Sequence, residues 1–213
     1  MRYQLGSAAA HISSPFLASY ATLPADEHLQ KGHHFRFRAF SKARVKGDAF
    51  LWDDDTTFFQ SDGINSYAGG RHRNFAPFGE PAREFAEGLV NSPATRALVT
   101  AEEFRIGCHQ IRIKADDEHV GLPAPEGFHQ DGYDLIAVTC VAVDNVSGGI
   151  SLVREKDPAG DVIVERVMPP GEALFLADQE VVHYVSPITP KVPGKPAYRD
   201  VAVITFSFEN ETP

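Results

Sequence analysis

The chain has 213 residues and a mass of 23.3 kDa, with 20 Lys and Arg against 29 Asp and Glu and a formal net charge of −9. This acidic balance argues against a nucleic-acid-binding protein, because such proteins neutralise phosphates with clustered Lys and Arg. The longest apolar run, residues 135–143, is far shorter than the ~20 residues of a membrane-spanning helix, which argues against a membrane protein.

The cysteine content and the N-terminus indicate where the protein acts. Cys108 and Cys140 lie in apolar segments and are too few for a disulfide scaffold. The N-terminus has no apolar run that ends in a small-residue cleavage site, and no repeat or Gly/Ser-rich linker interrupts the chain. We therefore expect a cytoplasmic protein in which residues 1–213 form a single domain, with an N-terminal helical and extended part over 1–103.

The first half of the chain contains a basic run and two helical patterns. The run over residues 35–46 carries five Lys and Arg, which could attract small anionic carboxylates. The simpler interpretation is a strand or loop with a solvated charged face. Phe85 and Leu89 are four residues apart and predict an amphipathic helix over 81–90. The sequence Asn91-Ser92-Pro93 predicts the start of a second helix.

From residue 104 onward the pattern changes to β. Short runs rich in Val, Ile and Phe alternate with turn residues, and no helical period separates them. The predicted strands cover residues 104–113, 135–143, 150–154, 162–167, 173–176, 181–185 and 201–208. So many short strands in one half of the chain favour a β-sandwich or barrel, with the first half packing helices and further strands against it.

Two of the nine histidines form a pattern with a carboxylate. His129 and Asp131 are two residues apart, so on an extended segment both side chains project to the same side. His183 lies 52 residues beyond Asp131, inside an apolar run. Two histidines and one carboxylate bind iron on one face and leave the opposite positions open, as an Fe(II) oxygenase requires, whereas a structural zinc site favours four ligands and Cys. The pattern predicts a metal site.

Arg199 follows His183 by 16 residues and leads into the last predicted strand. Its guanidinium fork suits the distal carboxylate of a dicarboxylic co-substrate, because it can bind both oxygens. The alternative is a salt bridge with Asp200 or Asp178. The full order of His-x-Asp, His and Arg across a β-rich half favours the co-substrate.

At these residues the sequence resembles the Fe(II)/2-oxoglutarate-dependent dioxygenases, in particular the small bacterial family of free-amino-acid hydroxylases that includes L-isoleucine 4-hydroxylase. The resemblance implies a mainly β fold with flanking helices, in which a double-stranded β-helix core (a cupin-like jelly roll) is buttressed by N-terminal helices. The stretches that carry it are residues 108–113, 125–132, 145–149, 170–178, 182–187 and 198–201, with 59–65, 69–70 and 73–75 in the first half.

The resemblance also implies the cofactors and their ligands. His129, Asp131 and His183 would bind Fe(II), Arg199 would bind 2-oxoglutarate, and O2 would be the third reactant. Many related oxygenases carry a Ser two residues after the Arg, but this chain has Val201 there. A second hydrogen bond to 2-oxoglutarate would then have to come from another residue; the candidates are Thr139, Tyr133 and Tyr198.

A free amino acid is the substrate that the resemblance implies, and its binding requires a cation for the α-carboxylate and an anion for the ammonium group. Arg112 is the first candidate for the carboxylate and Arg73 the second, while Gln110 lies on the same strand face as Arg112. Glu126, three residues before His129, is the candidate for the ammonium group unless it faces solvent on a turn.

The expected function is hydroxylation of a small substrate, chiefly a free aliphatic L-amino acid, with release of succinate and CO2 by a protein that could form a homo-oligomer. One alternative is an oxygenase of the same class that acts on a protein side chain or another metabolite. Another is a non-catalytic cupin-type metal-binding barrel, although cupins usually present three His and a Glu. Arg199 discriminates between these, because it has a role if 2-oxoglutarate binds and none in a plain cupin.

Overall fold

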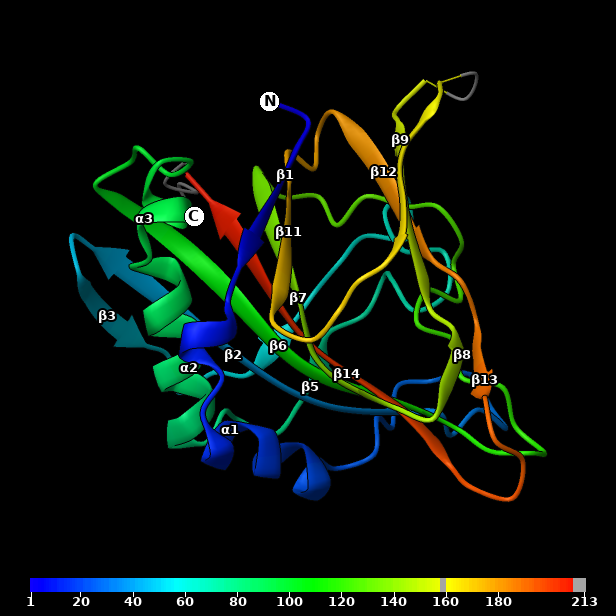
Figure 1. Ribbon diagram of the computed structural model, residues 1–213. Helices are drawn as coiled ribbons and strands as arrows, with labels where there is room; N and C mark the ends of the chain where they lie inside the picture. Colours follow the sequence, from blue (N-terminus) through cyan, green and yellow to red (C-terminus); the bar gives the residue numbers. More distant parts are fainter. Residues whose placement is uncertain (158–159, 209–213) are drawn as a thin grey trace.

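The computed structural model describes residues 1–157 and 160–208 and is built around an antiparallel sheet of seven strands (Figure 1). The first half of the chain contributes strands β1, β2 and β3 to this sheet, which is therefore not confined to residues 104–213. In spatial order the strands are β1 (Tyr3–Ser7), β11 (Glu172–Leu176), β7 (Leu135–Asp144), β14 (Ala197–Ser207), β6 (Glu103–Ala115), β2 (Arg36–Lys46) and β3 (Ala49–Trp52).

Shorter strands cover one face of the large sheet. β9 (Ile150–Glu155) lies between β10 (Val162–Val167) and β12 (Val181–Val185), and β8 (Val146–Gly148) pairs with β13 (Ile188–Pro190). A separate pair, β4 (Thr57–Phe58) and β5 (Arg73–Asn74), belongs to the segment that follows β3. A buried apolar cluster that includes Val153, Leu174 and Val181 fills the space between the small sheet and the large one. This arrangement is the jelly-roll core that the resemblance implies.

The helices pack on the opposite face of the large sheet (Figure 1). They are α1 (Ser14–Ser19), α2 (Glu80–Val90) and α3 (Pro93–Arg96), with 3-10 turns at Ala9–His11 and Tyr20–Thr22. α2 begins with Pro81 in its first turn, and α3 is capped by Ser92, whose hydroxyl accepts from the Thr95 amide. Phe85 on α2 stacks on Phe16 of α1 with ring centroids 4.4 Å apart. The predicted helical buttress is confirmed.

Most predicted elements are present, and the differences lie mainly at their ends. All seven predicted strands occur, although the last begins at Ala197 rather than at residue 201, and the two predicted helices are α2 and α3. The interpretation of the basic run was wrong for its first part. Arg36 and Arg38 are buried, because this end of β2 faces the inside of the jelly roll, whereas Arg44 and Lys46 beyond it are exposed.

No helix in the described part of the chain is long and apolar enough to cross a membrane.

Candidate active site

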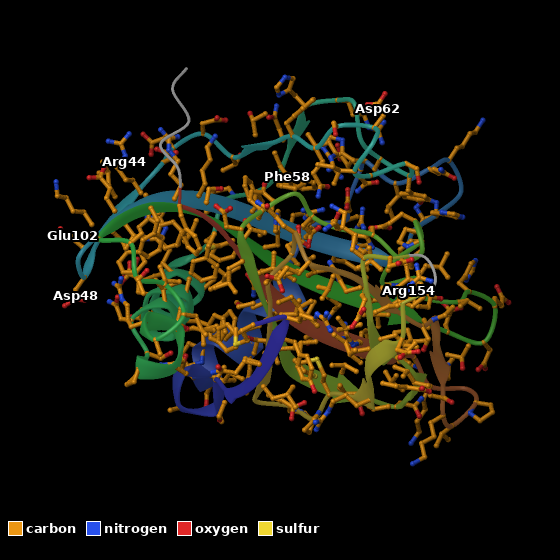
Figure 2. The ribbon with its side chains drawn as sticks, turned by 90° about the horizontal axis from the view of Figure 1, so that it is seen from above. Arg44, Asp48, Phe58, Asp62, Glu102 and Arg154 are labelled. Atoms are coloured by element: carbon orange, nitrogen blue, oxygen red, sulfur yellow. The ribbon has the colours of Figure 1, made fainter. Side chains whose placement is uncertain are left out.

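A cavity lies between the large sheet and the strands that cover it, and strand alternation decides which side chains reach it. On β6 the lining residues are His109, Ile111 and Ile113, while on β14 they are Arg199, Val201, Val203 and Thr205. Register places Arg36 of β2 beside Ile113, and Arg38 beside Ile111. Phe58 also lines the cavity; in Figure 2 it lies over the middle of the sheet, whereas Arg44, Asp48 and Glu102 lie at one end.

The three predicted metal ligands meet at this cavity. His183 lies on β12, and His129 and Asp131 lie on the long connection between β6 and β7. The backbones of His129 and His183 form a two-way bridge, with N–H to carbonyl distances of 3.1 and 2.9 Å, which sets the imidazoles side by side. One ligand atom from each of the three residues lies within 4.8 Å of the others. The tertiary structure thus assembles the His-Asp-His set.

The donor atoms suit a divalent metal. Nδ1 of His129 donates to the Gly127 carbonyl at 2.9 Å, so its Nε2 is the nitrogen with a free lone pair. This Nε2 lies 3.9 Å from one Asp131 oxygen, and Nε2 of His183 lies 3.4 Å from the other. Nε2 of His183 is also buried without a hydrogen-bond partner in the described residues. A buried imidazole nitrogen in this state fits a metal ligand, because an unsatisfied polar atom is otherwise costly.

Asp178 shapes the loop that carries Asp131. Its carboxylate is fully buried and accepts from the backbone amides of Asp131, Gly132 and Tyr133 at 2.9, 2.6 and 3.1 Å. Burial raises the pKa of Asp178, and the nearby Asp131 carboxylate adds to this. The hydrogen bonds of the Asp178 carboxylate therefore go to this loop, and Asp178 does not pair with Arg199.

A second contact holds the Asp131 side chain. Nε2 of Gln60 donates to the Asp131 carboxylate at 3.2 Å, while Oε1 of Gln60 accepts from Arg73 and Asn65, both at 3.1 Å. Arg73 can only donate, so it fixes the orientation of the Gln60 amide. Arg73 is 1% exposed and is absent from the cavity lining, so the structure places it behind Gln60 rather than against a substrate.

Arg199 points into the cavity with no acidic partner. It is 4% exposed, its Nη2 has no hydrogen-bond partner among the described residues, and burial lowers its pKa. Asp200, one of its possible partners, instead binds Arg112 through two contacts of 2.7 Å. Within the described residues no carboxylate lies at ion-pair distance from Arg199. A buried guanidinium in this state fits the anionic end of a co-substrate.

Several residues predicted at the site lie on the other face of the sheet. Gln110 and Arg112 alternate with the lining residues of β6 and therefore project toward the helices, where Gln110 donates to Ser19 at 2.6 Å. Tyr198 lies under the Arg112 guanidinium. Thr139 is buried beside Ala173 and Ala202 on that same face. The structure does not bring these four side chains to the cavity, because a shift of one residue along a strand reverses the face.

Two other predicted site residues, Tyr133 and Glu126, lie nearer the cavity. Tyr133 packs against the apolar cluster between the sheets and borders a neighbouring depression rather than the cavity. Glu126 does line the cavity, and its carboxylate lies 3.3 Å from Nε2 of His129. Metal coordination by that nitrogen would release the carboxylate for another partner.

The sequence interpretation missed Gln60 and the two arginines of β2 as site residues. Gln60, Arg36 and Arg38 all line the cavity. A signal for the arginines was present: Arg36, Arg38 and Phe40 alternate with apolar residues, as expected for a strand with both faces covered. The charge of the run concealed this, because Lys and Arg are rarely buried without a partner.

Comparison with known proteins agrees with this geometry. A family model described as 2OG-Fe dioxygenase matches residues 17–205. The chain belongs to this family. These dioxygenases use Fe(II), 2-oxoglutarate and O2, and the His-Asp-His set is the potential iron site of this member.

Individual relatives of this dioxygenase are distant in sequence and close in fold. The L-isoleucine-4-hydroxylase of Bacillus thuringiensis is 24% identical over 184 residues, which cover 82% of this chain and 75% of that protein. The crystal structure of a bsmA homolog from Methylobium petroleophilum has a TM-score of 0.76 at 25% identity and covers 98% of this chain and 90% of its own. The structure of IDO from Bacillus thuringiensis has a TM-score of 0.72 at 19% identity, with 98% and 91% covered.

Proposed function

We propose that this dioxygenase hydroxylates a free aliphatic L-amino acid and releases succinate and CO2. The observation that carries the proposal is the wall of the cavity. Beside the metal-ligand set it presents both a carboxylate, Glu126, and a group of aliphatic side chains. The aliphatic residues are Ile111, Val138, Val185, Val201 and Val203. The name of the Bacillus thuringiensis relative, which acts on L-isoleucine, supports the same substrate class.

In this proposal each polar residue of the cavity has a role that its contacts permit. His129, Asp131 and His183 would hold Fe(II), and Arg199 would bind the distal carboxylate of 2-oxoglutarate. Bound iron with this co-substrate supplies the oxidation of an unactivated C–H bond. Glu126 would accept hydrogen bonds from the substrate ammonium group. The aliphatic wall would position the side chain of the substrate and exclude water.

Two residues of β14 near Arg199 do not supply the second hydrogen bond to 2-oxoglutarate. Val201, two residues after Arg199, offers only a methyl surface to the cavity. Thr205 of the same strand also lines the cavity, and its hydroxyl already donates to the Gly107 carbonyl at 3.1 Å. That hydroxyl can still accept a hydrogen bond, but a co-substrate carboxylate would need a donor.

Anaerobic reconstitution with Fe(II) and 2-oxoglutarate, followed by air and a panel of free L-amino acids, tests the function. The expected result is succinate formation that depends on one aliphatic amino acid and matches a product heavier by one oxygen atom. Consumption of 2-oxoglutarate with no amino-acid product would contradict the substrate class and favour a protein side chain or another metabolite.

The cytoplasmic location, the single-domain organisation of residues 1–213 and the possible homo-oligomer stay predictions. Cell fractionation, limited proteolysis and light scattering would test them in turn.

A further inference from the structure

The cavity contains a second arginine that has no acidic partner. Arg38 is 6% exposed and projects from β2 into the cavity. Its guanidinium lies over the rings of Phe58 and Phe75, 5.1 and 4.5 Å from their centroids. Its Nε has no hydrogen-bond partner in the part of the chain that the structure describes. In residues 1–157 and 160–208 no carboxylate lies at ion-pair distance from it. A buried cation in this state would be stabilised by an anion bound in the cavity.

The other arginines of this region differ from Arg38. Arg36 forms a buried ion pair with Asp26 at 2.6 Å, and Arg73 binds Gln60. Burial, followed by repulsion from Arg36, lowers the pKa of Arg38 to about 9. A bound carboxylate would offset both effects, because an opposite charge favours the charged form of the guanidinium.

His109 orients the Arg38 guanidinium. Nη2 of Arg38 donates to Nδ1 of His109 at 2.7 Å, so His109 must be neutral with its proton on Nε2. Burial and the adjacent Arg38 hold the pKa of His109 well below its usual value. The imidazole is itself stacked on Phe40, with centroids 4.5 Å apart. These contacts leave the remaining N–H groups of Arg38 to face a ligand.

The position of Arg38 separates it from the co-substrate arginine. Ile111 of β6 is paired with Arg38 on one side and with Val201 on the other, and Val201 is two residues from Arg199. Two strand spacings across the sheet and two residues along β14 put the backbones of Arg38 and Arg199 about 12 Å apart. One small dicarboxylate bound to the metal and to Arg199 would therefore leave Arg38 without a partner.

The charges of the cavity indicate what binds there. Fe(II) and dianionic 2-oxoglutarate cancel, Asp131 cancels Arg199, and Asp26 cancels Arg36. Behind the cavity lining, the buried Arg73 and Asp178 also cancel. One cation, Arg38, and one anion, Glu126, are left. Together they match a zwitterion.

We propose that Arg38, oriented by His109, binds the α-carboxylate of the substrate, while Glu126 binds its ammonium group. This inference rests on the proposed function and narrows it to α-amino acids with both groups free. Peptide-bound residues and amines without a carboxylate are excluded, because each would leave a buried charge unpaired.

Substrate analogues paired with variants test this assignment. Binding is measured anaerobically by calorimetry on the full chain loaded with Mn(II) and 2-oxoglutarate. The probes are L-isoleucine, L-isoleucinamide, which lacks the carboxylate, and 3-methylpentanoate, which lacks the ammonium group. The wild type should prefer L-isoleucine to each analogue by about 10- to 100-fold, as expected for loss of a buried charged contact.

The variants assign each preference to one residue. Arg38→Gln should lower the affinity for L-isoleucine by about 10- to 100-fold and change the affinity for L-isoleucinamide by less than about 3-fold. The preference for L-isoleucine over the amide is then lost. Glu126→Gln should remove only the preference for L-isoleucine over 3-methylpentanoate. Arg44→Gln is the matched control, since Arg44 lies on the same face of β2 but is exposed, and it should change neither preference.

Different outcomes overturn different statements. If the Arg38→Gln variant retains its preference for L-isoleucine over the amide, the carboxylate assignment is wrong and the proposed function stands. If the variant instead lowers the affinity for 2-oxoglutarate, Arg38 belongs to the co-substrate site. If the wild type binds none of L-isoleucine, L-leucine, L-valine and L-methionine, the proposed function fails. If Arg38→Gln does not fold, Arg38→Lys is used in its place. The assignment is also wrong if the wild type binds L-isoleucinamide as tightly as L-isoleucine.

Discussion

The Asp131 carboxylate depends on residues that are distant in sequence. Gln60 donates to it from the N-terminal part of the chain, and Arg73 and Asn65 hold Gln60 in the orientation that permits this. None of the three belongs to the His-Asp-His set. In the proposed iron site they would be positioning residues, which act on the metal through Asp131.

Replacing Gln60 should therefore weaken metal binding. We expect Gln60→Ala to lower the affinity for Mn(II), measured by calorimetry without substrate, by about 10- to 100-fold, as is usual when a hydrogen-bond partner of a metal ligand is lost. Gln179→Ala is the control, because Gln179 is exposed and bonds Asp134 instead. Equal Mn(II) affinity in the two variants would show that Gln60 does not position Asp131.

A glycine beside Arg199 offers a second test at this scale. Gly149 has φ +68°, and a Cβ there would lie 3.2 Å from Ile188 and 3.4 Å from Cδ of Arg199. The contact with Ile188 is tight enough that this side chain must shift, whereas the contact with Arg199 is an ordinary van der Waals distance. Because any effect on Arg199 is therefore indirect, we expect Gly149→Ala to raise the KM for 2-oxoglutarate by only about 3-fold. Gly194→Ala is matched to it, since Gly194 has φ +79° with no atom within 4 Å of the added Cβ. Both variants bear the cost of a positive φ, about 1 kcal/mol, so only a change specific to Gly149→Ala supports the role of Arg199.

Among the elements, β6 shows most clearly how the two faces of one strand make different contacts. His109, Ile111 and Ile113 line the cavity, while Gln110 and Arg112 between them make contacts on the helical side. One strand thus serves the site with one face and the helical layer with the other.

The helical layer should contribute stability without contributing to the site. Phe85 is 2% exposed and stacks on Phe16, so Phe85→Ala leaves a cavity between α2 and α1. We expect a loss of about 3–5 kcal/mol in the free energy of unfolding, measured by urea denaturation. Phe59→Ala, at a position 49% exposed, should cost far less. Similar losses in the two variants would contradict the packing described here.

For the whole molecule, the metal site links parts that the sheet order keeps separate. His183 lies on the small sheet, whereas His129 and Asp131 lie on the connection between two strands of the large sheet. A metal held by all three would bind the folded chain and not the unfolded one, and would stabilise it by mass action.

Metal addition should therefore raise the melting temperature. With free Mn(II) at 100 times its Kd, the stabilisation is about 2.7 kcal/mol and should be visible as an increase in Tm. The increase should disappear in His183→Ala and persist in His119→Ala, whose imidazole is exposed and bonds Asp116. An unchanged increase in His183→Ala would place the metal elsewhere.

The sequence by itself determined the class of fold and selected the candidate metal ligands. Strands and turns in the second half are encoded locally by Val, Ile and Phe runs between Gly, Pro and Asn, and the helix over 81–90 by its apolar period. His129, Asp131, His183 and Arg199 could be selected because their order and residue types suit one chemistry, and the structure brings all four to one cavity.

Only the tertiary structure decided which other side chains reach that cavity. Arg112 and Gln110 were chosen by their closeness in sequence to the metal motif, yet strand alternation turns them to the opposite face. The basic run favours a solvated face for Arg38 over a carboxylate-binding role, yet pairing of β2 with β6 buries it. The physical reason is the same in both cases: the face of a strand and the partner across it depend on register between distant segments, and no local pattern of residues records that register.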